Sequence, residues 1–299
     1  MHNQKRAYIL ALLAVMCWST IAVAFKVTLR FTDPYQIVFI ASLVSWVTFT
    51  AIAVFRIGVV KLAGSVRKKD LLRSSLLGFL NPFFYYIILI HAYDMISAQE
   101  AMTLNYIWPV VLALLSVPML GQKLGLTSLA AMLISFAGII VIATKGDFAS
   151  LSFTSLRGDF LAAGSSVIWA LYWILNLKDK REIPTAMALN FFFGTVYAFL
   201  ALLIFSTPAS IPVNGWLGGT YLGLFEMGIT FLLWLSALKF SRKTYLISQF
   251  IFISPFLSLI WIRVVLGEPL LRSTILGLIL VITGIFIQQQ QERRSRKSA

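Results

Sequence analysis

The chain has 299 residues, of which 59% are hydrophobic and only 12% are charged, and its mean hydropathy is +0.87. A water-soluble core cannot absorb that much apolar surface, so the composition excludes a soluble globular protein and predicts a polytopic membrane protein. The net charge of +14 would suggest nucleic acid in a soluble protein. Here the basic residues lie between apolar runs, where membrane orientation explains them, and we expect no nucleic-acid partner.

Ten apolar runs, each close to the roughly 20 residues that span a hydrocarbon core, follow one another along the chain. They are Tyr8–Phe25, Pro34–Phe55, Ser74–Tyr93, Ala101–Gly121, Leu124–Thr144, Phe160–Leu177, Pro184–Phe205, Gly215–Leu238, Thr244–Ile262 and Ser273–Gln291. Hydrocarbon offers no partner for free backbone groups, and the runs are too long and unalternating for barrel strands. The predicted fold class is therefore an all-α polytopic membrane protein with ten transmembrane helices.

The distribution of basic residues predicts the orientation of these spans. Ten spans place both termini on one side of the membrane, and 19 of the 25 Lys and Arg residues lie in the termini and loops of that side. Because basic loops stay in the cytoplasm, we expect both termini to be cytoplasmic in a multi-pass protein of the cell inner membrane. The basic clusters 67–69 and 293–297 are interpreted as orientation signals, with binding of anionic membrane lipids as the alternative.

The two halves of the chain resemble each other. At an offset of 146 residues the matches are Pro109 with Pro255, Gly121 with Gly267, and Gly138 with Gly284; at 145 they are Gly78 with Gly223 and Ala92 with Ala237. We therefore predict two repeats, residues 1–149 with spans one to five and residues 150–299 with spans six to ten. Five is an odd number, so the second repeat enters the membrane from the opposite face and the repeats are inverted. Inverted repeats are a common construction of secondary transporters, although some channels contain them too.

Three sets of residues carry a family resemblance. They are Trp18, Lys26 and Pro34; Pro109, Gly121-Gln122-Lys123 and Gly138; and Pro255, Gly267-Glu268-Pro269 and Gly284. This pattern resembles the drug/metabolite transporter superfamily, specifically its ten-helix exporters built from two EamA-type repeats. The stretch 104–109, Leu-Asn-Tyr-Ile-Trp-Pro, is more particularly similar to the aromatic amino acid exporters. Two departures are the absence of an arginine within 39–42 of span two and the presence of Gln122 where a glutamate is usual, so roles of those groups in relatives are not transferred.

The resemblance implies a secondary transporter that exports small amphipathic solutes, aromatic amino acids and related compounds first among them, by alternating access. A passive solute channel and a lipid-handling membrane protein are the alternatives. The sequence contains no P-loop, only two histidines and one cysteine, and no serine or aspartate constellation with a histidine. We therefore predict no enzymatic activity, no cofactor and no metal site.

Glu226 is the clearest candidate site residue, since an ionisable group near the middle of a span is expensive. The repeat alignment pairs it with Asn81 in the middle of span three, which suggests a substrate site near the midplane between the repeats. Glu226 either binds an ammonium group of the substrate or carries a coupled proton. The structural alternative is a hydrogen bond between helices.

The remaining candidates lie on neighbouring spans. Tyr85 follows Asn81 by one helical turn and so shares its face, and Trp108 and Trp169 belong to spans resembling the cavity-lining helices of the family, with packing as an equal alternative. Asn105 and Gln249 are isolated amides that contact either the substrate or a neighbouring helix. His91 and Glu100 approach the same outer face, where they form either a gate or a local hydrogen bond.

Overall fold

The computed structural model describes residues 3–96, 101, 104–150, 155–206, 211–266 and 272–297, and these residues form helices joined by turns and short connections. The α-helices are α1 (Gln4–Ser19), α2 (Ile21–Thr28), α3 (Pro34–Ile57), α4 (Val59–Ser65), α5 (Lys68–Gly78), α6 (Tyr85–Met95), α8 (Trp108–Leu120), α9 (Leu126–Ala143), α10 (Leu156–Leu177), α11 (Ile183–Phe205), α12 (Val213–Leu222), α13 (Ile229–Phe240), α14 (Tyr245–Ser248), α15 (Ser254–Leu266) and α16 (Arg272–Lys297). The described residues also form two π-helical segments, η1 (Phe79–Phe84) and η4 (Gly223–Gly228), and two 3₁₀ segments, η2 (Phe148–Ser150) and η5 (Gln249–Ile253).

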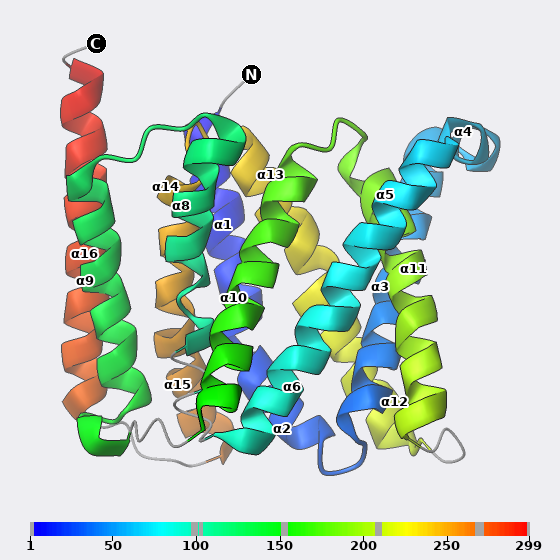
Figure 1. The fold of residues 1–299 in the computed structure, drawn as a ribbon, viewed down its shortest axis with the longest axis horizontal. Coiled ribbons are helices and arrows are strands. Elements are labelled where there is room, and N and C mark those ends of the chain that lie inside the picture. The colour runs from blue at the N-terminus through cyan, green and yellow to red at the C-terminus, as the bar shows by residue number, and fades with distance from the viewer. Residues whose placement is uncertain are drawn as a thin grey trace.

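The described helices confirm a multi-pass, all-α membrane protein. Eight continuous helical stretches, some of them made of consecutive elements such as α5, η1 and α6, are long and apolar enough to cross a membrane. Two shorter apolar helices, Trp108–Leu120 and Ile275–Gln291, fall on the fourth and tenth predicted runs. Both termini lie at the same end of the bundle (Figure 1). The short helix α4, between the second and third spans, is not among the predicted elements.

The boundaries of the second span follow from local chemistry. Asp33 caps the start of α3 by accepting a hydrogen bond from Gln36 N at 3.0 Å, while the Gln36 side chain accepts one from Asp33 N at 3.3 Å. Pro34 stands at the first helical position, where its missing N–H costs nothing. Gly58, with φ of +78°, ends the helix in a conformation that favours glycine.

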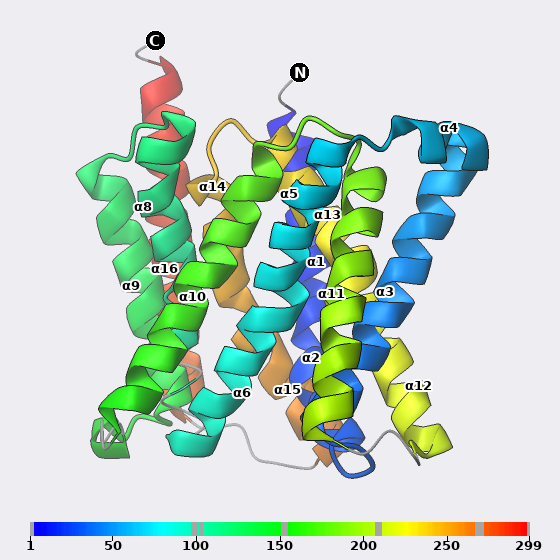
Figure 2. The same ribbon diagram turned by 45° about the vertical axis from the view of Figure 1, so that its right-hand side comes forward.

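The centre of the bundle is built from α1, α6, α8, α10 and α13, in which α10 packs against both α6 and α8 and α1 packs against α13. Helices α3, α11 and α12 lie together on one side, and α9 and α16 form a pair at the opposite edge (Figures 1 and 2). The centre therefore combines spans one, three and four with spans six and eight, that is, helices from both halves of the chain.

The antiparallel pair α9 and α16 shows the inverted relation of the halves directly. A Cβ atom on Gly138 would lie 2.5 Å from Gly277 O and 2.8 Å from Val281 Cγ2, and a Cβ atom on Gly284 would overlap Ala131 O and Ser135 Oγ. Ala131 and Gly277, Ser135 and Val281, and Gly138 and Gly284 are each 146 residues apart. The same contact is thus made twice, and an axis that exchanges two antiparallel helices lies across them, in the plane of the membrane.

Spans three and eight are both interrupted at matching places. The π-helical segment η1 breaks span three and η4 breaks span eight, and the residues 145 apart, Asn81 and Glu226, lie inside them. Both places pack against the opposite half: Gly78, directly before η1, lies against Asn190 O and Gly194 N of α11, and Gly223, the first residue of η4, lies against Ala41 O and Val44 of α3. These close approaches require glycine and hold the two polar residues in the interior.

Candidate functional site

Seven aromatic side chains from both halves meet in the centre of the bundle. We call them the central aromatic cluster: Trp18, Tyr85, Trp108, Trp169, Trp173, Phe231 and Trp234. Ring centroids are 4.4 Å apart for Tyr85 and Trp169, 4.9 Å for Trp173 and Phe231, and 5.1 Å for Trp18 and Trp234. None of the seven side chains is more than 8% exposed. Such a cluster presents π-faces and large apolar area, the surface that aromatic and cationic groups favour.

Glu226 lies against this cluster and is 9% exposed. Its Oε1 accepts a hydrogen bond from Tyr86 Oη at 2.8 Å, and its backbone oxygen accepts one from Trp18 Nε1 at 3.2 Å. Tyr86 belongs to α6 and Trp18 to α1, so both contacts of this carboxyl-bearing residue come from the other half of the chain. A carboxyl group between aromatic rings is chemically suited to a cation.

Asn105 is bound to two central helices. Its Nδ2 donates to Ser165 Oγ of α10 at 2.9 Å, and its Oδ1 accepts from Tyr85 Oη of α6 at 3.4 Å. The structure therefore brings Tyr85, Asn105, Trp108, Trp169 and Glu226 together at the centre. The contacts of Asn105 are those of a residue that joins helices and orients Tyr85.

Asn81 is fully buried, and neither its Oδ1 nor its Nδ2 has a hydrogen-bond partner among the described residues. Its backbone is extended rather than helical, with φ of −157° and ψ of 127°, and Pro82 follows it. The span is therefore kinked at Asn81 and Pro82, where a proline also removes one backbone N–H donor. The prediction that Tyr85 shares a helical face with Asn81 is wrong, because the backbone leaves the helical conformation at Asn81.

Three further candidates lie elsewhere. Gln249 is on η5, and its Nε2 donates to Ser135 Oγ at 3.0 Å and to Ala131 O at 3.4 Å, so it contacts α9 rather than the aromatic cluster. His91 is exposed, and its Nδ1 lies 2.8 Å from Ile87 O. Glu100 lies outside the described residues, as do Gly267, Glu268 and Pro269.

Several members of the site were missing from the sequence-based candidates, namely Trp18, Tyr86, Trp173, Phe231 and Trp234. A signal existed for Trp18, because Trp18 and Trp169 occupy similar places in the two repeats, and their rings lie 6.4 Å apart in the structure. The others sit in uninterrupted apolar runs, where nothing in one sequence separates a site aromatic from a packing aromatic.

A network of charges joins four spans at the end of the bundle where the termini lie. Asp179, between α10 and α11, is bound by Arg181 at 2.6 Å and by Arg73 of α5 at 3.3 Å. Lys239 of α13 donates to Asp179 O at 3.0 Å, and Arg181 also donates to Ser74 Oγ at 3.0 Å. Both halves of the chain are thus tied together around one carboxylate that is only 5% exposed.

Comparison with known proteins identifies the family to which this arrangement belongs. The model of the EamA-like transporter family matches residues 5–144 and matches again over residues 156–288. The chain belongs to this family. Its members and the relatives below are named as transporters, in agreement with a multi-pass protein that is not an enzyme.

The EamA-like chain is similar to transporters of several organisms. It is 24% identical to an uncharacterized transporter of Clostridium kluyveri, over 97% of this chain and 95% of that one, and 26% identical to one of Archaeoglobus fulgidus, over 94% and 98%. It is 28% identical to the aromatic amino acid exporter YddG of Ancylobacter novellus over 51% of this chain and 53% of that protein. A solved crystal structure at 21% identity has a TM-score of 0.84, covering 98% of this chain and 99% of the other, which establishes the fold.

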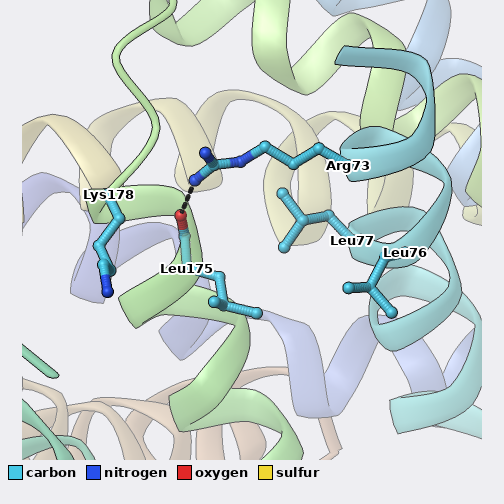
Figure 3. A pocket seen from close by; sticks show the side chains of 5 residues that line it. All are labelled: Arg73, Leu76, Leu77, Leu175 and Lys178. Carbon is cyan, nitrogen blue, oxygen red and sulfur yellow. Dashed lines mark hydrogen bonds between the residues drawn. The ribbon is translucent and has the colours of Figure 1, made fainter. Parts of the chain in front are cut away.

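In this EamA-like transporter, Arg73 also fastens the end of α10. Its Nη2 donates to Leu175 O at 2.7 Å beside a pocket of about 290 Å³ lined by Arg73, Leu76, Leu77, Leu175 and Lys178 (Figure 3). The guanidinium therefore bonds to both Asp179 and the last turn of α10, where carbonyl groups lack helical partners. The Arg73 side chain, from the first half, thus bonds both to α10 and to the connection between α10 and α11 in the second half.

Removal of the central carboxylate of this network, by Asp179→Asn, should destabilise the transporter. Burial opposes the charged form of Asp179, but the hydrogen bonds from Arg181 and the charges of Arg181 and Arg73 outweigh it and hold the pKa below its ordinary value. In this variant the two guanidinium groups lose their counter-charge, and we expect the free energy of unfolding to fall by roughly 1 to 3 kcal/mol at neutral pH. Thermal unfolding in detergent, followed by circular dichroism, measures this loss.

The pH dependence of this stability loss tests whether the charge of Asp179 causes it. A carboxyl group with a depressed folded-state pKa stabilises the protein above its unfolded pKa of about 4, and this contribution is lost as the pH falls through the folded value. The difference between wild type and Asp179→Asn should be constant from pH 7 to 5 and narrow below about pH 4. Glu182→Gln, an exposed acid of the same loop, is the control. A difference independent of pH would contradict the ion-pair account.

Proposed function

We propose that this transporter exports small amphipathic solutes that carry an aromatic group and an ammonium group, with aromatic amino acids as the first class, by alternating access. The observation that carries the proposal is the central aromatic cluster around Glu226. The aromatic side chain of the solute stacks among the rings, and the ammonium group binds the Glu226 carboxylate. The similarity to the aromatic amino acid exporter of Ancylobacter novellus supports this class.

The inverted arrangement supports the transport cycle in this proposal. Glu226 is held by Tyr86 and Trp18 of the opposite half, so the site lies where the halves meet. A movement of one half against the other changes access to such a site from one side of the membrane to the other without moving the site itself. In the cycle, the Asp179 network closes the terminus side and opens when solute enters from there.

The proposal includes an orientation, with both termini in the cytoplasm of a cell that exports through its inner membrane. The excess of basic residues on the terminus side supports it. A single cysteine placed after Arg296, in a Cys17→Ser background, should react with an impermeant maleimide in inside-out vesicles and not in intact cells. The reverse labelling pattern would contradict this orientation.

Transport itself is tested with purified protein in liposomes. Uptake of radiolabelled phenylalanine, tryptophan, threonine and alanine is measured against empty liposomes, and unlabelled phenylalanine is trapped inside to drive exchange. We expect saturable flux, accelerated by the trapped solute, for phenylalanine and tryptophan above threonine and alanine. Flux that does not saturate and shows no exchange indicates a channel, and lipid scrambling without solute flux indicates a lipid-handling protein.

A further inference from the structure

Two tryptophans of the central aromatic cluster carry N–H groups without an acceptor. Trp173 and Trp234 are both fully buried, and their Nε1 atoms have no hydrogen-bond partner among the described residues. Trp18 and Trp261, by contrast, donate to Glu226 O at 3.2 Å and Ser19 Oγ at 3.0 Å. Because an indole N–H only donates, and a buried donor without an acceptor is costly, two such groups in one cluster require an explanation.

Both donors belong to the central aromatic cluster, against which Glu226 lies. The ring of Trp234 is 5.1 Å from that of Trp18, and Trp18 in turn bonds to the backbone of Glu226. Trp234 also lies on the same span as Glu226, eight residues after it. Trp173 joins the cluster through Phe231, at 4.9 Å.

Glu226 and the central aromatic cluster together therefore offer one acidic group and two N–H donors without an acceptor. Glu226 suits a cation, whereas N–H groups without an acceptor suit an anion, to which they make charge-assisted hydrogen bonds. Asn81 adds an unpartnered Nδ2 on η1, which packs against α10. Two unpartnered acceptors, Asn81 Oδ1 and Asn190 Oδ1, are also buried. The side-chain amides of Asn81 and Asn190 each have an acceptor oxygen beside their donor, whereas an indole N–H only donates. The two indoles are therefore the groups that select a negative charge.

We propose that the indole N–H groups of Trp173 and Trp234 bind the carboxylate of the solute, so that the site selects zwitterionic amino acids over amines of the same shape. This inference rests on the proposed function and narrows its substrate class. Phenethylamine lacks only the carboxylate of phenylalanine, and 3-phenylpropionate lacks only its ammonium group. The three compounds therefore separate the two charged contacts.

The test measures how each unlabelled compound inhibits exchange of radiolabelled phenylalanine in proteoliposomes. Wild type should be inhibited by phenylalanine at a concentration at least about 10-fold lower than by phenethylamine, the size of one hydrogen bond to a charged group. Trp173→Phe and Trp234→Phe keep an aromatic ring and remove the N–H. The double variant should bring the ratio to within about 3-fold through weaker phenylalanine binding, with phenethylamine unchanged. Trp261→Phe, whose indole bonds to Ser19, is the matched control and should keep the wild-type ratio.

Indole resonances give a readout in the wild-type protein. In protein labelled with ¹⁵N-indole tryptophan, the N–H signals of Trp173 and Trp234, assigned from the single variants, should shift with phenylalanine and not with phenethylamine. Equal inhibition of wild type by both compounds, or an unchanged ratio in the double variant, would overturn the inference and leave the proposed function intact. That result would identify the indoles as packing groups. Absence of any phenylalanine exchange by wild type would overturn both this inference and the proposed function.

Discussion

Glu226→Gln should reduce exchange of radiolabelled phenylalanine at least about 30-fold, because removing one partner of a buried charge pair costs about 2 kcal/mol or more. Glutamine keeps the shape and still accepts from Tyr86, so the loss isolates the negative charge. Tyr86→Phe is the matched comparison. It removes one hydrogen bond to the carboxyl group and leaves the charge, and we expect an effect of only several-fold.

The same variant distinguishes the two roles considered for Glu226. Exchange between equal concentrations of phenylalanine needs substrate binding but no net proton movement, whereas uphill uptake driven by a pH gradient needs both. If Glu226→Gln exchanges phenylalanine at the wild-type rate but loses gradient-driven uptake, the ammonium contact is wrong and the residue carries a proton. Loss of both activities supports the ammonium contact.

Gly78→Ala should lower the free energy of unfolding by roughly 1 to 3 kcal/mol, the range for overpacking a close contact. The added Cβ would overlap Asn190 O and lie 2.7 Å from Gly194 N, and both are backbone atoms of α11, so the helix itself must move. The change occurs directly before η1, the segment that positions Asn81. We therefore expect phenylalanine exchange to fall together with stability.

Gly164→Ala is the control for this prediction. Gly164 also lies within a span, on α10, but an added Cβ has no atom within 4 Å. Alanine in a helix interior is about 0.5 to 1 kcal/mol more favourable than glycine, so this variant should be neutral or more stable. Thermal unfolding in one detergent compares both variants with wild type. Equal effects of the two substitutions would show that the contact between the end of α5 and α11 is not tight.

The sequence was enough to predict the helical fold, because burial of apolar runs in hydrocarbon leaves the backbone few alternatives. The 146-residue offset of Gly138 and Gly284 also anticipated the contact that relates the halves. Local geometry was not predictable in the same way. Asn81 lies in a run that reads as continuous helix, yet it is extended, and this break separates it from Tyr85.

For the site, polarity was informative and aromatic character was not. Glu226 and Asn105 stand out in apolar runs, and the structure places both at the centre. Gln249 stands out equally, yet it contacts α9, since a buried amide needs a partner wherever it lies. Tyr86 has no feature that separates it from Tyr85 in the sequence. Only the folded structure, in which Tyr86 donates to Glu226, shows which tyrosine meets the carboxyl group.

The symmetric contact of α9 with α16 has the form of an isologous dimer interface contained in one chain. In a dimer of identical subunits every substitution at such an interface appears twice. Within one chain each position can change alone, and the two sides of the α9–α16 contact do differ. Ser135 donates to Val281 O at 3.2 Å and accepts from Gln249, whereas its counterpart Val281 offers only methyl groups. Two halves with one architecture can therefore carry different chemistry, just as Asn81 and Glu226 do at the centre.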